Sequence, residues 1–340
     1  MITTVTGDIK RDSVKYLLPH EHLFFDMRPL VSPIDDPDFH KKLALSNFGK
    51  VSRNPYAVLD NAAMDEDDIQ TEELKILKNT GCNLLVDATT GDFGRDALRL
   101  REISQKSGVM IVAGCGWYTD AAVSDDKKEL SEDAMLSHMM ADITSGIDGT
   151  DIKAGIIGEI GTSGKMTPFE KRSVRVAARA QKKTNLGMHI HADLWSREGL
   201  EALDIALNEG ANPEKVCINH TDVLLDEEYI FEVLKRGALI EFDNFGKEFY
   251  VDRKNRNLLQ GSFATDVERV KMLCRLIEKG YEKQLLITND ICLKSMTHAY
   301  GGWGYDHVIT NIIPMMKDFG IDDDCIGLIM KDNPVRFLEK

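Results

Sequence analysis

The sequence lacks the long apolar segments and paired cysteines that mark membrane or secreted proteins. No run of about 18 or more apolar residues occurs, so no transmembrane helix is predicted. The opening residues, MITTVTGDIKRDSVKY, contain no apolar stretch like that of a signal peptide. The six cysteines are scattered without a CxxC pair, which fits neither a zinc–thiolate site nor a disulfide framework. We therefore expect a cytoplasmic protein with reduced thiols.

Positive charge and proline are also scarce. The chain has 42 Lys and Arg against 56 Asp and Glu, a formal net charge of -14. Such a field repels nucleic acids and anionic membranes, so neither is an expected partner, and an anionic ligand would need a local basic pocket. With nine prolines and 43% hydrophobic residues, the 340 residues can bury one large core. We expect a single domain over 1–340 rather than two smaller ones.

Eight short runs rich in Val, Ile and Leu are each followed by a helical pattern. They lie at 16–24, 83–90, 109–116, 154–161, 186–193, 216–222, 238–245 and 284–290. Capping-box patterns predict helix starts at Thr167 with Glu170 and at Thr265 with Glu268. Glycines stand where helices should end, at positions 81, 108, 210, 237, 280 and 320. This rhythm predicts an α/β fold, a closed parallel (β/α)8 TIM barrel; an open doubly wound sheet is the alternative.

One stretch interrupts the rhythm. Residues 25–65 join the first predicted strand to the first predicted helix with little sustained periodicity. Loops of this length are usually functional or disordered. Because a loop after a barrel strand lies on the face where active sites are built, we hypothesise that these residues form a lid over the site. A flexible loop without such a role is the alternative.

A histidine pair begins the candidate site. Two histidines two positions apart on a strand face the same side with Cα atoms about 7 Å apart, so His20 and His22 can converge on one ion. Alone, this is a weak indication. Further candidates stand at the C-terminal ends of later predicted strands: Glu159, His191, His220 and Asp290. Imidazoles and carboxylates converging on one barrel mouth suit a pair of divalent ions such as zinc. For Glu159, among apolar neighbours in GIIGEIGT, we prefer a metal partner to a salt bridge.

With these residues in place, the chain resembles the phosphotriesterase-related family of the amidohydrolase superfamily over nearly its whole length, including the phosphotriesterase homology protein and lactonase branch. The matching segments are TVTGDI at 4–9, HEHL at 20–23, TSGKMTPFE at 162–170, HADL at 191–194, INHTD at 218–222, TND at 288–290, GGWGYDH at 301–307 and NPVRFL at 333–338. The resemblance implies that His20, His22 and Asp290 hold a buried metal and that His191 and His220 hold a more exposed one. It also implies that Glu159 bridges the two, where phosphotriesterases proper carry a carboxylated lysine. The metals would be zinc, with manganese or cobalt as alternatives.

The predicted chemistry is hydrolysis. Two cations about 3.5–4 Å apart can share a hydroxide and lower the pKa of water toward about 7. Asp290 would accept the proton as this hydroxide attacks and deliver it to the leaving group. Hydrolysis of a lactone, a carboxyl ester, is the leading hypothesis; a phosphotriesterase or an amidase could use the same site, and a non-catalytic metal-binding barrel is a further alternative.

Residues near the strand ends suggest a substrate. Tyr118 falls where the resemblance implies an aromatic facing the metals, as in lactonases; a rim residue packing the lid is the alternative. Basic residues follow the seventh and eighth predicted strands. We hypothesise that Lys247, Arg253 and Lys294 include an anchor for an anionic group, such as the phosphate of a phosphorylated sugar lactone. The expected partner is a small molecule, and the resemblance adds a possible homodimer.

Overall fold

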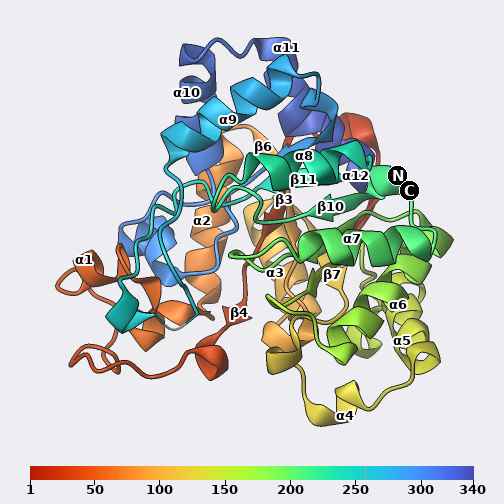
Figure 1. The fold of residues 1–340 in the computed structure, drawn as a ribbon, viewed down its shortest axis with the longest axis horizontal. Coiled ribbons are helices and arrows are strands. Elements are labelled where there is room, and N and C mark those ends of the chain that lie inside the picture. Colours follow the sequence, from red (N-terminus) through yellow and green to blue (C-terminus); the bar gives the residue numbers. More distant parts are fainter. Residues whose placement is uncertain (257) are drawn as a thin grey trace.

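Eight parallel strands form the central sheet of the computed structural model, which describes residues 1–256 and 258–340 (Figure 1). Their hydrogen-bonded order is β12-β11-β10-β9-β8-β7-β6-β3. The strands are β3 (Tyr16–Glu21), β6 (Cys82–Asp87), β7 (Met110–Cys115), β8 (Ile156–Gly161), β9 (Met188–His191), β10 (Val216–Ile218), β11 (Leu239–Phe242) and β12 (Leu285–Ile287). The two end strands approach each other, since Thr288 Oγ1 donates to the carbonyl of His20 at 3.1 Å. The predicted barrel is confirmed, with each of the eight predicted strands present.

Helices follow the strands and cover the outside of the sheet (Figure 1). The longer ones are α2 (Asp67–Asn79), α3 (Ala97–Ser107), α5 (Glu132–Thr144), α6 (Pro168–Thr184), α7 (Gly199–Asn208), α8 (Glu227–Lys235) and α9 (Asp266–Glu278). The shorter ones are α1 (Phe48–Val51), α4 (Asp125–Lys128), α10 (Ile313–Asp318), α11 (Asp323–Gly327) and α12 (Asn333–Leu338). Both predicted capping boxes form, at α6 and α9. All six predicted helix-ending glycines have a left-handed φ, which a residue without a Cβ adopts at little cost.

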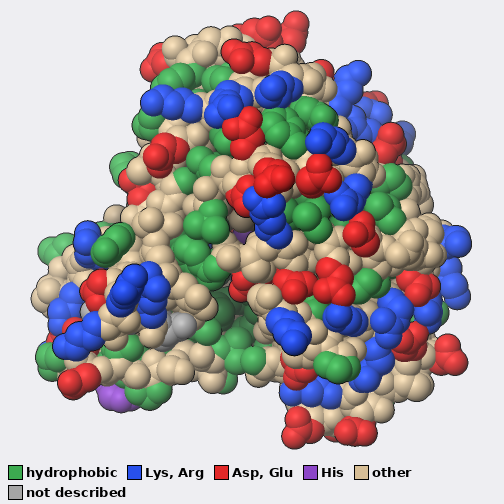
Figure 2. All heavy atoms as spheres, viewed as in Figure 1, with side chains coloured by type: hydrophobic (Ala, Val, Ile, Leu, Met, Phe, Trp, Pro, Cys, Tyr) green, Lys and Arg blue, Asp and Glu red, His purple; other side chains and the backbone are tan. Residues whose placement is uncertain are grey.

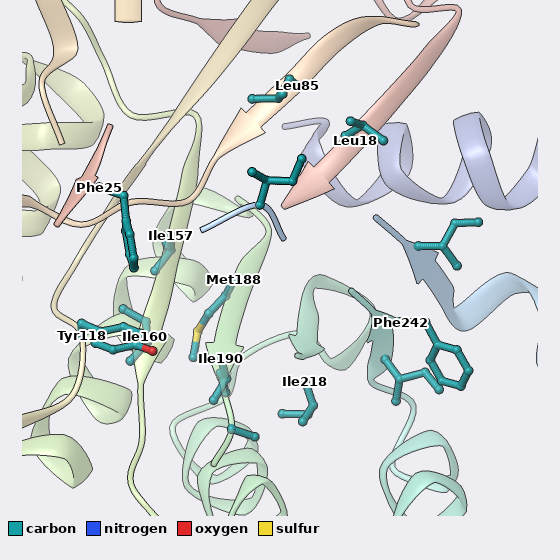
Figure 3. Close-up of a cluster of buried hydrophobic side chains, with 14 of the residues drawn as sticks. Leu18, Phe25, Leu85, Tyr118, Ile157, Ile160, Met188, Ile190, Ile218 and Phe242 are labelled. Carbon is teal, nitrogen blue, oxygen red and sulfur yellow. The ribbon is translucent and has the colours of Figure 1, made fainter. Parts of the chain in front are cut away.

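Apolar side chains form two main cores because strand residues alternate between faces. One core lies between the sheet and the helices; Figure 3 shows part of it, with Leu18, Leu85, Ile190 and Phe242 among its members. The other core includes the alternate strand residue Leu17 and is completed by residues near both chain ends. These chain ends lie side by side (Figure 1).

A hairpin that the sequence analysis did not predict belongs to this second core. Strands β1 (Ile2–Thr4) and β2 (Gly7–Ile9) pair in an antiparallel ladder, and Ile2 is fully buried. Among the described residues, no helix is long and apolar enough to cross a membrane.

The segment at 25–65 is folded. It leaves and returns through an antiparallel pair, β4 (Phe25–Asp26) and β5 (Ala63–Met64), in which Phe25 is opposite Met64. Between them it has the helix α1 and its own small apolar cluster of Leu43, Val51 and Val58. We call residues 25–65 the excursion. It forms the lobe at the lower left of Figure 1.

Candidate metal centre

All six residues predicted to bind metal meet at the carboxyl ends of the barrel strands. They are supplied by five strands or the residues just after them: His20 and His22 at β3, Glu159 in β8, His191 at the end of β9, His220 after β10 and Asp290 after β12. Five of the six are buried, and His191 is partly exposed. The closed sheet therefore brings together residues that are far apart in the sequence.

Glu159 lies at the centre of the cluster. Its Oε2 is 3.4 Å from His20 Nε2, and its Oε1 is 3.7 Å from His22 Nε2. On the other side, the same Oε2 is 3.3 Å from His191 Nδ1 and 3.6 Å from His220 Nε2. The side chains thus form two groups of possible ligands that share one carboxylate. This is the arrangement expected for a bridging glutamate between two ions.

Asp290 faces the first of these groups. Its Oδ1 is 3.1 Å from His22 Nε2 and 3.8 Å from His20 Nε2. Its other oxygen, Oδ2, accepts a hydrogen bond from the Lys247 ammonium. Burial alone would raise the pKa of the Asp290 carboxyl, but the charges of Lys247 and the nearby histidines outweigh it and hold the pKa below its ordinary value. Asp290 is therefore a carboxylate beside the centre.

The far nitrogens of three histidines are held by outer partners. His20 Nδ1 is 3.0 Å from Glu241 Oε2, and His220 Nδ1 is 2.9 Å from Asp243 Oδ1. His22 Nδ1 is 2.9 Å from Thr89 Oγ1. Such contacts fix the ring orientation, so that the Nε2 lone pair can face an ion.

Two atoms test whether these residues fit a metal. His20 Nε2 and Glu159 Oε2 are buried and have no hydrogen-bond partner among the described residues. A buried polar atom without a partner costs on the order of 1–3 kcal/mol. A divalent cation would satisfy both atoms at once, because imidazole nitrogen and carboxylate oxygen are both zinc ligands. The donors therefore fit the metal pair that was predicted.

Two of the proposed ligands have an unusual backbone conformation. His220 and Asp290 have φ values of 59° and 48°, in the left-handed region that residues with a Cβ rarely occupy. Such strain persists only where surrounding contacts enforce it, and it clusters at functional sites. For His220 one such contact is the hydrogen bond from its backbone N–H to Asp243 Oδ2, at 2.9 Å.

A layer of polar residues below the centre was mostly missed by the sequence analysis. His189 is a buried, hydrogen-bonded residue of this layer: its Nε2 is 2.9 Å from the carbonyl of Pro19, and burial lowers its pKa to about 3. Glu241, Asp243 and Asn219 were not identified. The signal was present, since Glu241 and Asp243 stand two apart in the predicted strand ALIEFDNF and so share its inward face with the histidine partners.

The four predicted substrate contacts divide into two groups. Tyr118 and Lys247 both line the cavity above the centre, and the Tyr118 hydroxyl is 3.1 Å from the ring nitrogens of His191. Arg253 is exposed and does not line that cavity. Lys294 is buried away from it, with its Nζ 3.5 Å from Asp60 Oδ1. The structure thus does not bring the three cations together as an anion anchor, because Lys294 is turned toward the excursion.

The cavity has a volume of about 320 Å³ and opens above the metal ligands. The excursion contributes Met27, Leu30 and Tyr56 to its wall. Segments after β9 and β11 contribute Trp195, Leu259 and Phe263. Figure 2 shows a recess with hydrophobic side chains on its walls, between the lobe that carries α1 and the rest of the molecule. The geometry therefore combines a polar floor with a largely apolar wall.

Comparisons with known proteins identify the family of the chain. An N-acetyltaurine hydrolase from Xenopus tropicalis is 32% identical, covering 99% of this chain and 97% of its own. The solved structure of a resiniferatoxin-binding protein from Rhodobacter sphaeroides is 31% identical with a TM-score of 0.94, covering 99% of this chain and 94% of that one. A mutant of a PTE-like lactonase from Deinococcus radiodurans is 26% identical with a TM-score of 0.78, covering 99% and 100%. The phosphotriesterase family model matches residues 1–338. The chain is a hydrolase that belongs to the phosphotriesterase family.

Proposed function

We propose that this hydrolase cleaves a carboxyl derivative at a pair of divalent ions, with an amide as the first candidate substrate and a lactone as the second. The observation that carries the proposal is the position of Glu159 between two groups of histidines, 3.4 Å from His20 and 3.3 Å from His191. One carboxylate shared by two ligand groups is suited to hold two ions close together.

The ions we propose are zinc, with manganese or cobalt as alternatives, because the donors are imidazoles and carboxylates without thiolates. His20, His22 and Asp290 would hold one ion, His191 and His220 the other, and Glu159 both. When bound, such a pair activates water as a nucleophile and polarises the bond to be cleaved.

The residues of the chain supply the proton transfers. Asp290 is buried and ionised, so it can accept a proton from the attacking water and return it to the leaving group. Lys247 is hydrogen-bonded to Asp290 and keeps the carboxylate in place. Tyr118 can donate a hydrogen bond to a substrate oxygen, because burial raises its pKa well above the ordinary value and keeps it protonated.

Two comparisons support the choice of bond. The relatives named N-acetyltaurine hydrolase are 30–32% identical along nearly the whole chain. The substrate in that name contains an amide bond. An amine leaving group needs a proton as the C–N bond breaks, and Asp290 can deliver the proton that it has taken from the attacking water while Lys247 holds it in place. The structural likeness to a PTE-like lactonase supports a lactone as the second candidate.

The test is a metal assay followed by a substrate panel. Purified protein would be measured for zinc, manganese and cobalt and then assayed with simple amides, lactones and a phosphotriester. We expect about two ions per chain and turnover of amides or lactones. Glu159→Ala should lose metal and activity together, whereas Glu72→Ala, an exposed glutamate on α2, should not. Turnover of the phosphotriester alone, or full activity of Glu159→Ala, would contradict the proposal.

A further inference from the structure

Apart from the metal ions proposed above, the described residues of the cavity offer no free cation for an anionic substrate. Among the described residues that line it, Lys247 is the only Lys or Arg, and its ammonium is bound to Asp290. Asp193 adds a further carboxylate to the wall. A sulfonate or phosphate buried against the wall, away from the proposed ions, would lose its hydration without gaining an unpaired Lys or Arg, which is costly. The cavity therefore disfavours an anionic group.

Neutral hydrogen-bond donors take the place of a cation. Tyr56 lines the cavity and is 5% exposed, yet the one hydrogen bond of its hydroxyl among the described residues is to the thioether of Met27, at 3.4 Å. A thioether is a weak acceptor, and buried tyrosine hydroxyls usually find a stronger one. The buried Nε1 of Trp195, another lining residue, has no hydrogen-bond partner among the described residues. A substrate carbonyl or ether oxygen is the acceptor that such donors fit.

The excursion fixes Tyr56 in this position. Asn61 is fully buried and donates from Nδ2 to the carbonyl of Pro55, the residue before Tyr56, at 2.8 Å. The Oδ1 of the same Asn61 accepts from the backbone N–H of Ser295, after β12, at 2.7 Å. The position of Tyr56 is thereby tied to the same connection that carries Asp290.

Resting on the proposed function, we propose that Tyr56 is a substrate-binding residue and that the substrate carries an uncharged, apolar group. The Tyr56 hydroxyl would exchange its weak contact with Met27 for a hydrogen bond to a substrate oxygen. The apolar group would lie against side chains such as Leu30 and Phe263. This chain would then differ in preference from an enzyme that acts on N-acetyltaurine, which carries a sulfonate.

The first test compares four amides in a square design. The amides vary in the length of the acyl chain and in the charge of the amine part: N-acetyltaurine, N-hexanoyltaurine, N-propylacetamide and N-propylhexanamide. Two lactones, one with an alkyl and one with a carboxyalkyl side chain, are assayed beside them. We expect kcat/KM to rise roughly fourfold for each buried methylene and to be at least roughly tenfold higher for the uncharged member of each pair. Preference for the sulfonate or carboxylate members would overturn the inference while leaving the proposed hydrolysis intact. No turnover of any compound would instead count against the proposed function.

The second test uses matched variants. Tyr56→Phe should lower kcat/KM for the uncharged substrates by roughly three- to tenfold, since one neutral hydrogen bond is lost. Tyr250→Phe is the control, because Tyr250 is 47% exposed and does not line the cavity. Leu30→Arg should shift preference toward the anionic substrates, and Leu45→Arg, at a position 92% exposed on the same excursion, should not. Equal kinetics for Tyr56→Phe and the wild type would refute the role of Tyr56.

Discussion

Asp243 provides the sharpest check on the proposed metal centre, because it is outside the proposed ligand set and contacts the proposed ligand His220. Its two oxygens accept from His220, Oδ1 from Nδ1 and Oδ2 from the backbone N–H, both at 2.9 Å. In Asp243→Asn the amide keeps one acceptor, and its NH₂ group must face one of these donors. The variant thus loses a hydrogen bond to a charged acceptor, which contributes about 1.5–3 kcal/mol. At about 1.4 kcal/mol per factor of ten, metal retention should fall by roughly 10- to 150-fold.

The assay is a titration with a competing chelator, followed by metal analysis and by kcat/KM at increasing metal concentration. We expect the variant to lose the ion proposed at His191 and His220 at lower chelator concentrations than the wild type does. Excess metal should partly restore its activity. Asp318→Asn, at an exposed position on α10, is the matched control. Metal affinity within about twofold of the wild type, in a variant with an unchanged fold, would refute the reasoning that this contact positions His220.

Three further predictions concern the buried charged residues Asp290, Lys294 and Lys215. Asp290→Asn should lower turnover by about 10³-fold with metal still bound, as judged by metal analysis; wild-type rates would rule out its role in proton transfer. Lys294→Met should lower the free energy of unfolding, measured in urea, by about 1 kcal/mol, because Asp60 loses one of its two lysine partners and keeps Lys42. A change in KM for anionic substrates without a change in stability would instead indicate the anchor first hypothesised. Burial lowers the pKa of Lys215 to about 8 from 10.5, so the unfolded chain binds more protons and stability should rise from about pH 8 to 10.5. Lys215→Met should flatten this rise, and superimposable stability curves would contradict the reasoning.

The strands and the ligand set could be predicted from the sequence because both are encoded locally. Each strand is a short apolar run, and His191, His220 and Asp290 stand at or just past the end of one. In a parallel barrel the carboxyl ends of all strands meet at one face, so a position along the chain translates directly into a position in space. The apolar runs of the sequence therefore predicted the barrel, and the barrel in turn predicted that the residues at its strand ends lie close together.

The directions of long side chains could not be predicted in this way. Lys247 and Lys294 both follow strand ends, yet one lines the cavity and the other is turned away. The partner that decides the matter for Lys294 is Asp60, which lies 234 positions earlier in the excursion. Because the excursion has almost no periodicity, its fold depends on such distant contacts. Local sequence patterns therefore predicted neither the fold of the excursion nor the direction of the Lys294 side chain.

The pairing of Phe25 with Met64 places the two ends of the excursion side by side on a short ladder. The entropic cost of closing such a loop depends only weakly on its length, so residues can be inserted between these anchors at exposed positions such as Leu45 at low cost to the barrel. All six proposed metal ligands lie outside the excursion, so such changes would alter which substrates fit the cavity and leave the proposed ligand set unchanged. The ladder thus lets the exposed part of the excursion vary, and with it the substrates that fit the cavity, without displacing the polar floor.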